Sequence, residues 1–216
     1  MRAKHIIIKE LRLPIYIVLE LASKLENTEK LNAMNPLKVI FLVRDPRAIM
    51  ASRNSLYPDR GFGQQLRELC FHMGQNIAYF KHLIEISNVS LEMHFLRFED
   101  LMVIDPIGKS RQLFKKLSLP FTVETEKWIR ENTNDPTTNT NPFSTTRDSN
   151  TVFLKWTNTL NMIEIDIIQK ACSNTMFEFG YKTIKTEKLR ESFEYNFTLG
   201  DTVNFNDFSL KKWSIL

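Results

Sequence analysis

Short apolar runs and amphipathic stretches alternate along the chain. Three runs rich in β-branched and aromatic residues predict strands, over residues 5–11, 38–43 and 93–98. The run at 38–43 is continuously apolar, which is typical of a strand buried on both faces of a parallel sheet. Helical segments separate these strands, so the pattern predicts an α/β fold with a mainly parallel sheet flanked by helices.

The regions between and after the strands predict helices and loops. Besides a helix that begins at Pro46, five segments are predicted to be helical, and they cover residues 14–25, 66–84, 105–117, 123–131 and 160–179. Gly180 is the predicted C′ residue at the end of the last helix. The run of Thr, Asn, Pro and Ser at 132–150 predicts a loop, and the polar residues 185–216 predict a loosely packed tail.

The end of the strand at 38–43 carries the candidate chemistry. Arg44 follows the strand, Asp45 is a favourable N-cap, and Pro46 suits the first position of a helix. Ligands of parallel sheets bind beyond this end of the strands, and a helix N-terminus there favours an anion. Arg44 can hold a phosphate through two parallel hydrogen bonds, and Ser52, eight residues later, can add a hydroxyl donor. The pattern therefore predicts an anion site.

A structural role is the alternative for the same residues. Arg44 could instead pair in the core with Glu99 or Asp100, and the serine would then be an ordinary helix residue. Arg47 and Arg53 are expected to be solvated or to pair locally. Glu99 and Asp100, two adjacent acids at a strand end, could act as a general base. We expect them instead to be structural and to anchor the following helix.

The composition narrows the class of ligand. The chain has 216 residues, enough for one α/β domain, and 29 Lys and Arg against 25 Asp and Glu give a net charge of +4. So mild an excess suits a small anion and is not a nucleic-acid signature. No apolar run predicts a membrane span, and the first residues do not predict a signal peptide. Cys70 and Cys172 do not make a metal site on their own, so they are either two buried apolar residues or one disulfide.

The stretch KVIFLVRDPRAIMASR, at residues 38–53, carries a family resemblance. It resembles the segment with which carbohydrate sulfotransferases bind the 3′-phosphate of 3′-phosphoadenylyl sulfate (PAPS). That family places an arginine at the strand end and a serine eight positions later. Arg44 and Ser52 match both positions, so the resemblance implies that they bind the phosphate.

Further matches follow downstream in the family's order. The stretch LRFEDL at residues 96–101 is similar to the next family element, with Phe98 in place of the usual tyrosine. The stretch STTR at residues 144–147 is also similar, and it implies that Arg147 is a second phosphate contact. The ordered agreement extends over roughly residues 36–182.

The resemblance implies a P-loop NTPase-like sulfotransferase fold, in a partial domain over residues 1–184 with a polar tail at 185–216. It implies transfer of a sulfuryl group from PAPS, without a metal, to a glycan acceptor. The most similar subgroup of the family transfers sulfate to the 6-hydroxyl of N-acetylglucosamine or galactose. No residue is assigned as catalytic. The resemblance also implies a lumenal domain of a Golgi membrane protein, and it favours a disulfide between Cys70 and Cys172.

One family feature is not found in the sequence. The family has a 5′-phosphosulfate loop, rich in glycine or serine, near the start of its catalytic domain, whereas residues 1–37 contain no glycine. We therefore expect a chain truncated at the N-terminus, without that loop, the first strand and the membrane anchor. The alternative is a catalytically inactive nucleotide-binding or scaffold remnant of such an enzyme. A P-loop kinase is not supported, because the stretch Gly108-Lys109-Ser110 has Val103 where a Walker A loop needs glycine.

Overall fold

The computed structural model is a mixed α/β structure, mostly helical, around a two-stranded parallel sheet. It describes residues 5–10, 13–26, 37–86, 91–102, 105–133 and 152–192, with only the backbone for 26 and 82–86. Strand β1 (Leu37–Val43) pairs with strand β2 (Leu91–Arg97), from Leu37 opposite Leu91 to Val43 opposite Arg97. The two later predicted strands and their parallel pairing are confirmed.

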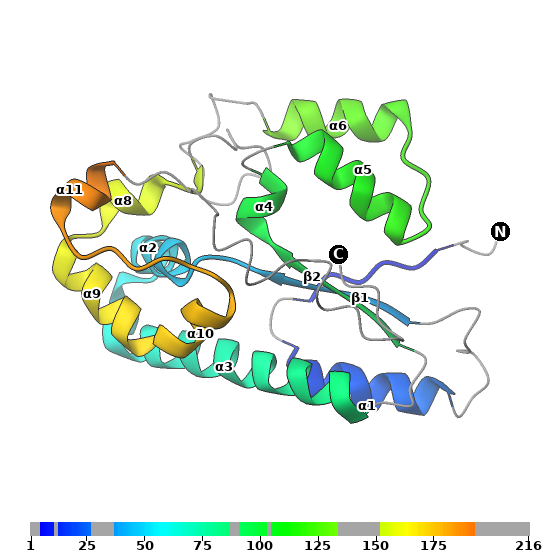
Figure 1. The fold of residues 1–216 in the computed structure, drawn as a ribbon, viewed down its shortest axis with the longest axis horizontal. Coiled ribbons are helices and arrows are strands. Elements are labelled where there is room, and N and C mark those ends of the chain that lie inside the picture. The colour runs from blue at the N-terminus through cyan, green and yellow to red at the C-terminus, as the bar shows by residue number, and fades with distance from the viewer. Residues whose placement is uncertain are drawn as a thin grey trace.

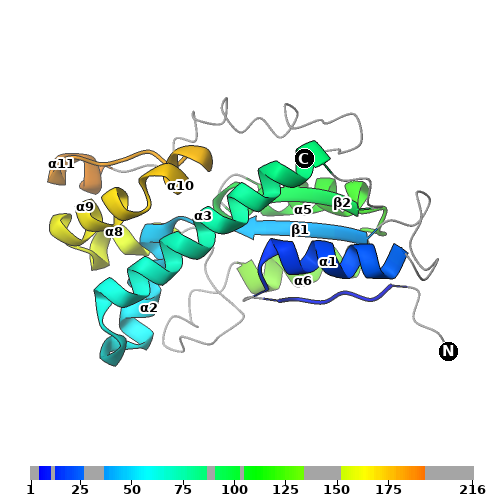
Figure 2. The ribbon, with the colours of Figure 1, turned by 90° about the horizontal axis from the view of Figure 1, so that it is seen from below.

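Helices lie on both sides of this sheet (Figure 1). On one side are α1 (Ile15–Glu26) and α3 (Phe62–Ile86), and on the other are α5 (Pro106–Lys116) and α6 (Val123–Thr133) (Figures 1 and 2). The four corresponding helix predictions are confirmed with small shifts at their ends. The Gly108-Lys109-Ser110 stretch lies in the first turns of α5, where Asp105 Oδ1 accepts the N–H of Gly108 at 2.8 Å, so it is a capped helix start and not a Walker A loop.

The carboxyl ends of both strands lead directly into helices. Two residues separate β1 from helix α2 (Pro46–Leu56), which is followed by a short 3-10 helix, Pro58–Arg60. Helix α4 (Phe98–Met102) begins immediately after β2. The carboxylate of Asp45 accepts the N–H of Arg47 at 2.8 Å, with proline as the first helical residue, so the predicted cap is confirmed.

Four shorter helices gather at this same end of the strands, beside α2 (Figure 1). They are α8 (Lys155–Thr159), α9 (Met162–Ala171), α10 (Ser173–Glu178) and α11 (Glu187–Glu191). The single helix predicted over 160–179 is wrong, because α9 and α10 are separated at Cys172. Helix α11 forms inside the segment predicted to be a loosely packed tail.

Helix α10 ends in a backbone motif that fixes the chain after it. Gly180 has a φ of +72°, and the N–H of the next residue, Tyr181, donates to the carbonyl of Met176 at 2.8 Å. The predicted C′ role of Gly180 is confirmed, since this pattern requires a left-handed residue that glycine adopts without strain. The turn leads Tyr181 into the core, where it is buried.

Aromatic side chains join the sheet to the helices of one face. The ring of Phe41 on β1 lies 5.7 Å from Phe80 of α3, 5.9 Å from Phe95 of β2 and 6.1 Å from Phe179, all as distances between ring centroids. Phe95 and Phe179 stack at 5.4 Å. Such pairs each stabilise by about 0.5–1.5 kcal/mol beyond their burial.

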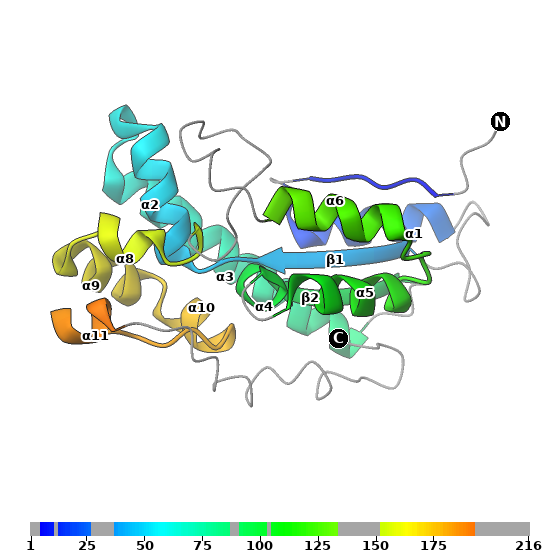
Figure 3. The ribbon, with the colours of Figure 1, turned by 90° about the horizontal axis from the view of Figure 1, so that it is seen from above.

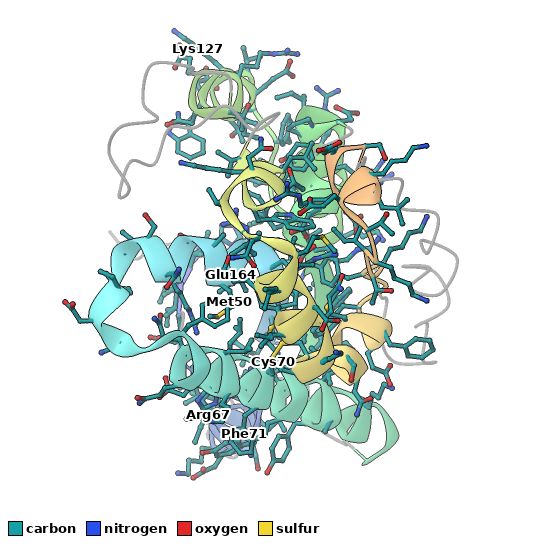
Figure 4. The ribbon with its side chains drawn as sticks, turned by 90° about the vertical axis from the view of Figure 1, so that its left-hand side faces the viewer. Met50, Arg67, Cys70, Phe71, Lys127 and Glu164 are labelled. Atoms are coloured by element: carbon teal, nitrogen blue, oxygen red, sulfur yellow. A yellow bond between two sulfur atoms is a disulfide. The ribbon has the colours of Figure 1, made fainter. Side chains whose placement is uncertain are left out.

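A disulfide links two of these elements covalently. Cys70 of α3 is bonded to Cys172, at the junction of α9 and α10 and 102 residues further along the chain (Figure 4). Of the two alternatives for the cysteines, the structure has the disulfide. It ties the C-terminal helices to the helix that packs under the sheet.

Two expectations about strands are wrong. Residues 5–10 form no strand: Figures 2 and 3 show an extended segment, and Ile6, Ile7 and Ile8 are 81–83% exposed. β-Branched residues favour extended backbone, but a strand also needs a hydrogen-bonded neighbour. Strand β1 is likewise not buried on both faces, since Ile40 and Leu42 are 41% and 53% exposed.

Candidate anion-binding site

Three arginines lie at the carboxyl ends of the two strands. Arg44 follows β1, Arg47 is in the first turn of α2, and Arg97 is the last residue of β2. An arginine can bind an external anion only with N–H groups that protein acceptors do not already occupy. The contacts of the three side chains therefore decide which of them is a candidate.

Arg97 is fully engaged by the protein. Its guanidinium group donates to both carboxylate oxygens of Asp100, at 2.7 and 2.9 Å, and to the carbonyl of Phe179 at 2.9 Å. The side chain is 2% exposed. This bidentate pair satisfies the charge internally, so Arg97 has a structural role. Asp100 is structural for the same reason.

Arg47 is also engaged, and it is buried. It contacts Asp45 with its Nε and Nη2 atoms, the latter at 2.7 Å, and its Nη1 atom donates to the side chain of Gln169 and to the carbonyl of Lys182. Its guanidinium group lies 4.2 Å from the ring centroid of Trp156. Of the two expectations for Arg47, local pairing is confirmed and solvation is wrong.

Arg44 differs from both. It forms no ion pair with any residue in the described part of the chain, so the alternative of a pair with Glu99 or Asp100 is wrong. Its Nη2 atom makes one long contact, 3.4 Å, to the carbonyl of Val152, and its buried Nε atom has no hydrogen-bond partner among the described residues. A buried donor without a partner costs about 1–3 kcal/mol, which a bound anion would relieve.

The ring of Phe98 supports the guanidinium group of Arg44 from one side, at 4.9 Å from its centroid. Phe98 stands where the resembling family usually has tyrosine. A cation over an aromatic ring is held by electrostatic attraction that leaves the in-plane N–H groups available. The contact orients Arg44 without occupying its hydrogen-bond donors.

The N-terminus of α2 is less open to an anion than the sequence predicts. Pro46 has no N–H, the N–H of Arg47 is accepted by Asp45, and the N–H of Asp45 donates to Glu99 Oε1 at 2.9 Å. These positions cannot serve a ligand as well. The side chain of Arg44 is therefore the main candidate donor for an anion.

The remaining predicted contacts are Ser52 and Arg147. Ser52 lies in α2 and is exposed. It is one turn beyond residue 48 of the first helical turn and lies on the same face of the helix. Arg147 lies outside the described residues.

Glu99 is a part of the site whose role was not predicted from the sequence. Its carboxylate is completely buried and accepts two hydrogen bonds, from the N–H of Asp45 at 2.9 Å and from the hydroxyl of Tyr181 at 2.8 Å. Burial, and then the negative charge of Asp45, raise the pKa of Glu99 to about 7. Instead of only anchoring its own helix, this acid joins three segments that are far apart in the sequence.

Two further properties concern the described residues only. They contain no group of three His, Cys, Asp or Glu side chains that could hold a metal ion. None of the helices among them combines the length and the apolar character needed to cross a bilayer.

The fold and the site define an α/β protein in which an arginine at the carboxyl end of a parallel strand has no acidic partner among the described residues. Comparison with known proteins agrees with this class. The chain is 30% identical to mouse carbohydrate sulfotransferase 1 over 201 residues, which cover 85% of this chain and 46% of the mouse protein. It is also 30% identical to carbohydrate sulfotransferase 3 of Tetronarce californica over 167 residues, which cover 69% of this chain and 37% of that protein.

The chain is thus a homologue of carbohydrate sulfotransferases 1 and 3. It spans less than half the length of the curated relatives it matches. No protein-family profile matches the chain. No solved structure matches it either.

Proposed function

We propose that this protein transfers a sulfuryl group from PAPS to a carbohydrate hydroxyl, and that Arg44 and Ser52 hold the 3′-phosphate of the nucleotide. The observation that carries the proposal is the state of Arg44, whose buried Nε atom has no partner among the described residues, while Arg47 and Arg97 are fully engaged. Homology with carbohydrate sulfotransferases supports the reaction class.

The residues present fit a phosphate group. Arg44 offers in-plane donors next to a supporting ring, Ser52 offers a hydroxyl on the following helix, and Arg147 is the proposed third contact. A guanidinium group binds phosphate through two parallel hydrogen bonds, which fixes orientation as well as position. When bound, PAPS supplies the activated sulfuryl group, and these residues bind and orient the other end of the nucleotide.

The proposal includes the finer expectations from the sequence. The fold would be the P-loop NTPase-like sulfotransferase fold, with the domain over residues 1–184 and the tail at 185–216. The acceptor would be a glycan, at the 6-hydroxyl of N-acetylglucosamine or galactose. The compartment would be the Golgi lumen, and the disulfide of Cys70 with Cys172 supports it, because such bonds persist in oxidising compartments.

The direct test measures binding of adenosine 3′,5′-bisphosphate by titration calorimetry. The protein is expected to bind the nucleotide, and Arg44→Ala to weaken binding tenfold or more, since a hydrogen bond to a charged group is worth about 1.5–3 kcal/mol. The matched control is Arg67→Ala, which removes the same charge from an exposed position of α3 (Figure 4) and should leave binding within about twofold. Equal binding by the protein and Arg44→Ala would discard the site assignment.

The second candidate function is nucleotide binding without sulfate transfer. The state of Arg44 is compatible with it, because a donor atom without a partner among the described residues bears on anion binding and not on sulfuryl transfer. An assay with PAPS and glycans ending in N-acetylglucosamine or galactose separates the two candidates. Sulfated product supports the enzyme, and nucleotide binding without product supports the second candidate.

A further inference from the structure

The position of Glu99 links it to Arg44 through one peptide unit. Glu99 Oε1 accepts the N–H of Asp45, which is the peptide group that joins Asp45 to Arg44. Its other carboxylate oxygen accepts the hydroxyl of Tyr181, so the carboxylate is fixed from a second side. Both Glu99 and Tyr181 are buried, which leaves little freedom for the three groups to move separately.

The residue before Glu99 acts on the same arginine. Phe98 lies under the guanidinium group of Arg44, at 4.9 Å from the ring centroid. Two consecutive residues at the start of α4 therefore hold Arg44 at both ends, Phe98 at the guanidinium group and Glu99 at the backbone. A shift of the Glu99 carboxylate would move the peptide that carries Arg44.

We propose that Glu99 is a positioning residue of the anion site: it directs Arg44 by holding the Asp45 peptide, and the protonation of its carboxyl group regulates anion binding there. The inference rests on the proposed function for the anion site at Arg44 and for the nucleotide used as a probe. Glu99 itself touches no ligand in this assignment.

The surroundings of Glu99 determine how it responds to pH. The charged or titratable groups on the elements packed around it include Arg44, Asp45, Arg47, Arg97, Asp100 and Tyr181. Arg47 is paired with Asp45, and Arg97 with Asp100, so no basic group forms an ion pair with Glu99 in the described part of the chain. Burial thus raises the pKa of Glu99 to about 7.

Protonation then removes a negative charge from the residue next to Phe98, whose ring carries the guanidinium group of Arg44. The neutral acid still has a carbonyl oxygen to accept the Asp45 N–H and a hydroxyl to donate toward Tyr181. The positioning contact persists while the repulsion of an anion disappears. Binding is therefore tighter on the acid side of pH 7.

The first experiment follows Arg44 without any ligand. Glu99→Gln keeps the shape and one acceptor of the side chain but cannot ionise, so it imitates the protonated acid. The NMR signals of the Arg44 Nε–H and the Asp45 amide are expected to shift with a midpoint near pH 7 in the unmodified protein, and to be flat in Glu99→Gln. Signals that do not titrate, or that titrate equally in the variant, would overturn the inference.

The second experiment measures adenosine 3′,5′-bisphosphate binding at pH 6 and pH 8, where Glu99 is about nine-tenths protonated and nine-tenths ionised. Comparison with Glu99→Gln at each pH cancels the titration of the ligand's own phosphates. Both proteins should bind equally at pH 6, and Glu99→Gln should bind at least threefold tighter at pH 8. Glu99→Ala should weaken binding tenfold at both pH values, while the matched control Glu92→Gln, near the other end of β2, should change nothing.

The outcomes separate this inference from the proposed function. If no protein binds the nucleotide but the Arg44 signal follows Glu99, the proposed function fails and inorganic phosphate replaces the nucleotide as the probe. If the nucleotide binds through Arg44 but Glu99→Ala binds as the unmodified protein does, the positioning role is wrong and the proposed function stands. Circular dichroism of each variant checks that it folds, and Glu99→Gln still tests the inference if Glu99→Ala does not.

Discussion

An arginine lies at or just past the end of each of the two paired strands, and the two arginines differ in their hydrogen-bond partners. Arg97, at the end of β2, is buried with every contact inside the protein, on Asp100 and on a main-chain carbonyl. Arg44, just past the end of β1, lies on an aromatic ring and has a buried donor with no partner in the described structure. Sequence position makes them look alike, and their partners make one structural and the other available.

The difference shows how a binding residue can be recognised without a bound ligand. A buried donor without a partner is costly, so proteins keep one only where something else compensates it. The acids near Arg44 are already used, since Asp45 pairs with Arg47 and Glu99 holds a peptide N–H. Within the described part of the chain, the surrounding network thus leaves Arg44 without an acidic partner, which is why we propose it as the anion-binding residue.

The largest expected effect is on the Arg97 side. Arg97→Met should lower the free energy of unfolding by about 3–5 kcal/mol, because it leaves the Asp100 carboxylate buried without its partner. Urea denaturation measures this. Arg44→Ala should cost less than about 1 kcal/mol in the same measurement, and a similar loss for both variants would erase the distinction between the two arginines.

The next effect is the dependence of stability on pH that comes from Glu99. Because the pKa of Glu99 is raised from 4.5 to about 7, its contribution to stability is fully present below pH 4.5 and is lost as the pH rises through 7. Relative to the unmodified protein, Glu99→Gln should therefore gain about 2–3 kcal/mol of stability between pH 5 and pH 8. Denaturation at both pH values tests this, and a difference that does not change with pH would contradict the raised pKa.

Removal of the disulfide should mainly destabilise the contacts made at the end of β2. Cys70→Ala with Cys172→Ala should lower the free energy of unfolding by about 2–4 kcal/mol, because the bond closes a loop of 102 residues. The segment that follows α10 supplies the carbonyl of Phe179 to Arg97 and the hydroxyl of Tyr181 to Glu99. Hydrogen exchange should rise there and change less in β1, and unaltered stability under reducing conditions would argue against the bond.

The smallest expected effect is at the serine of the proposed phosphate site. Ser52→Ala should weaken adenosine 3′,5′-bisphosphate binding by about 1 kcal/mol, roughly fivefold, with no change in stability because the side chain is exposed. Ser55→Ala, on the same helix and also exposed, is the matched control. Equal effects of the two variants on binding would mean that Ser52 is not part of the phosphate site.

Local signals in the sequence were sufficient for most elements near the site. The apolar run before Arg44, the Asp45 cap, the proline after it and the glycine after α10 all act through their own backbone or through nearest neighbours. Such signals need no knowledge of the rest of the chain. They were less reliable where a distant partner decides, as in residues 5–10, whose isoleucines favour a strand but pair with no strand in the described part of the chain.

By itself, the sequence determined the strand, the arginine that follows it and the capped helix, together with the family resemblance. Only the tertiary structure decided which arginine stays available, because that depends on acids, carbonyls and rings brought from positions up to 135 residues away. Burial likewise gave Glu99 its role, since the pKa and the contacts of a carboxyl group come from what surrounds it and not from its place in the chain.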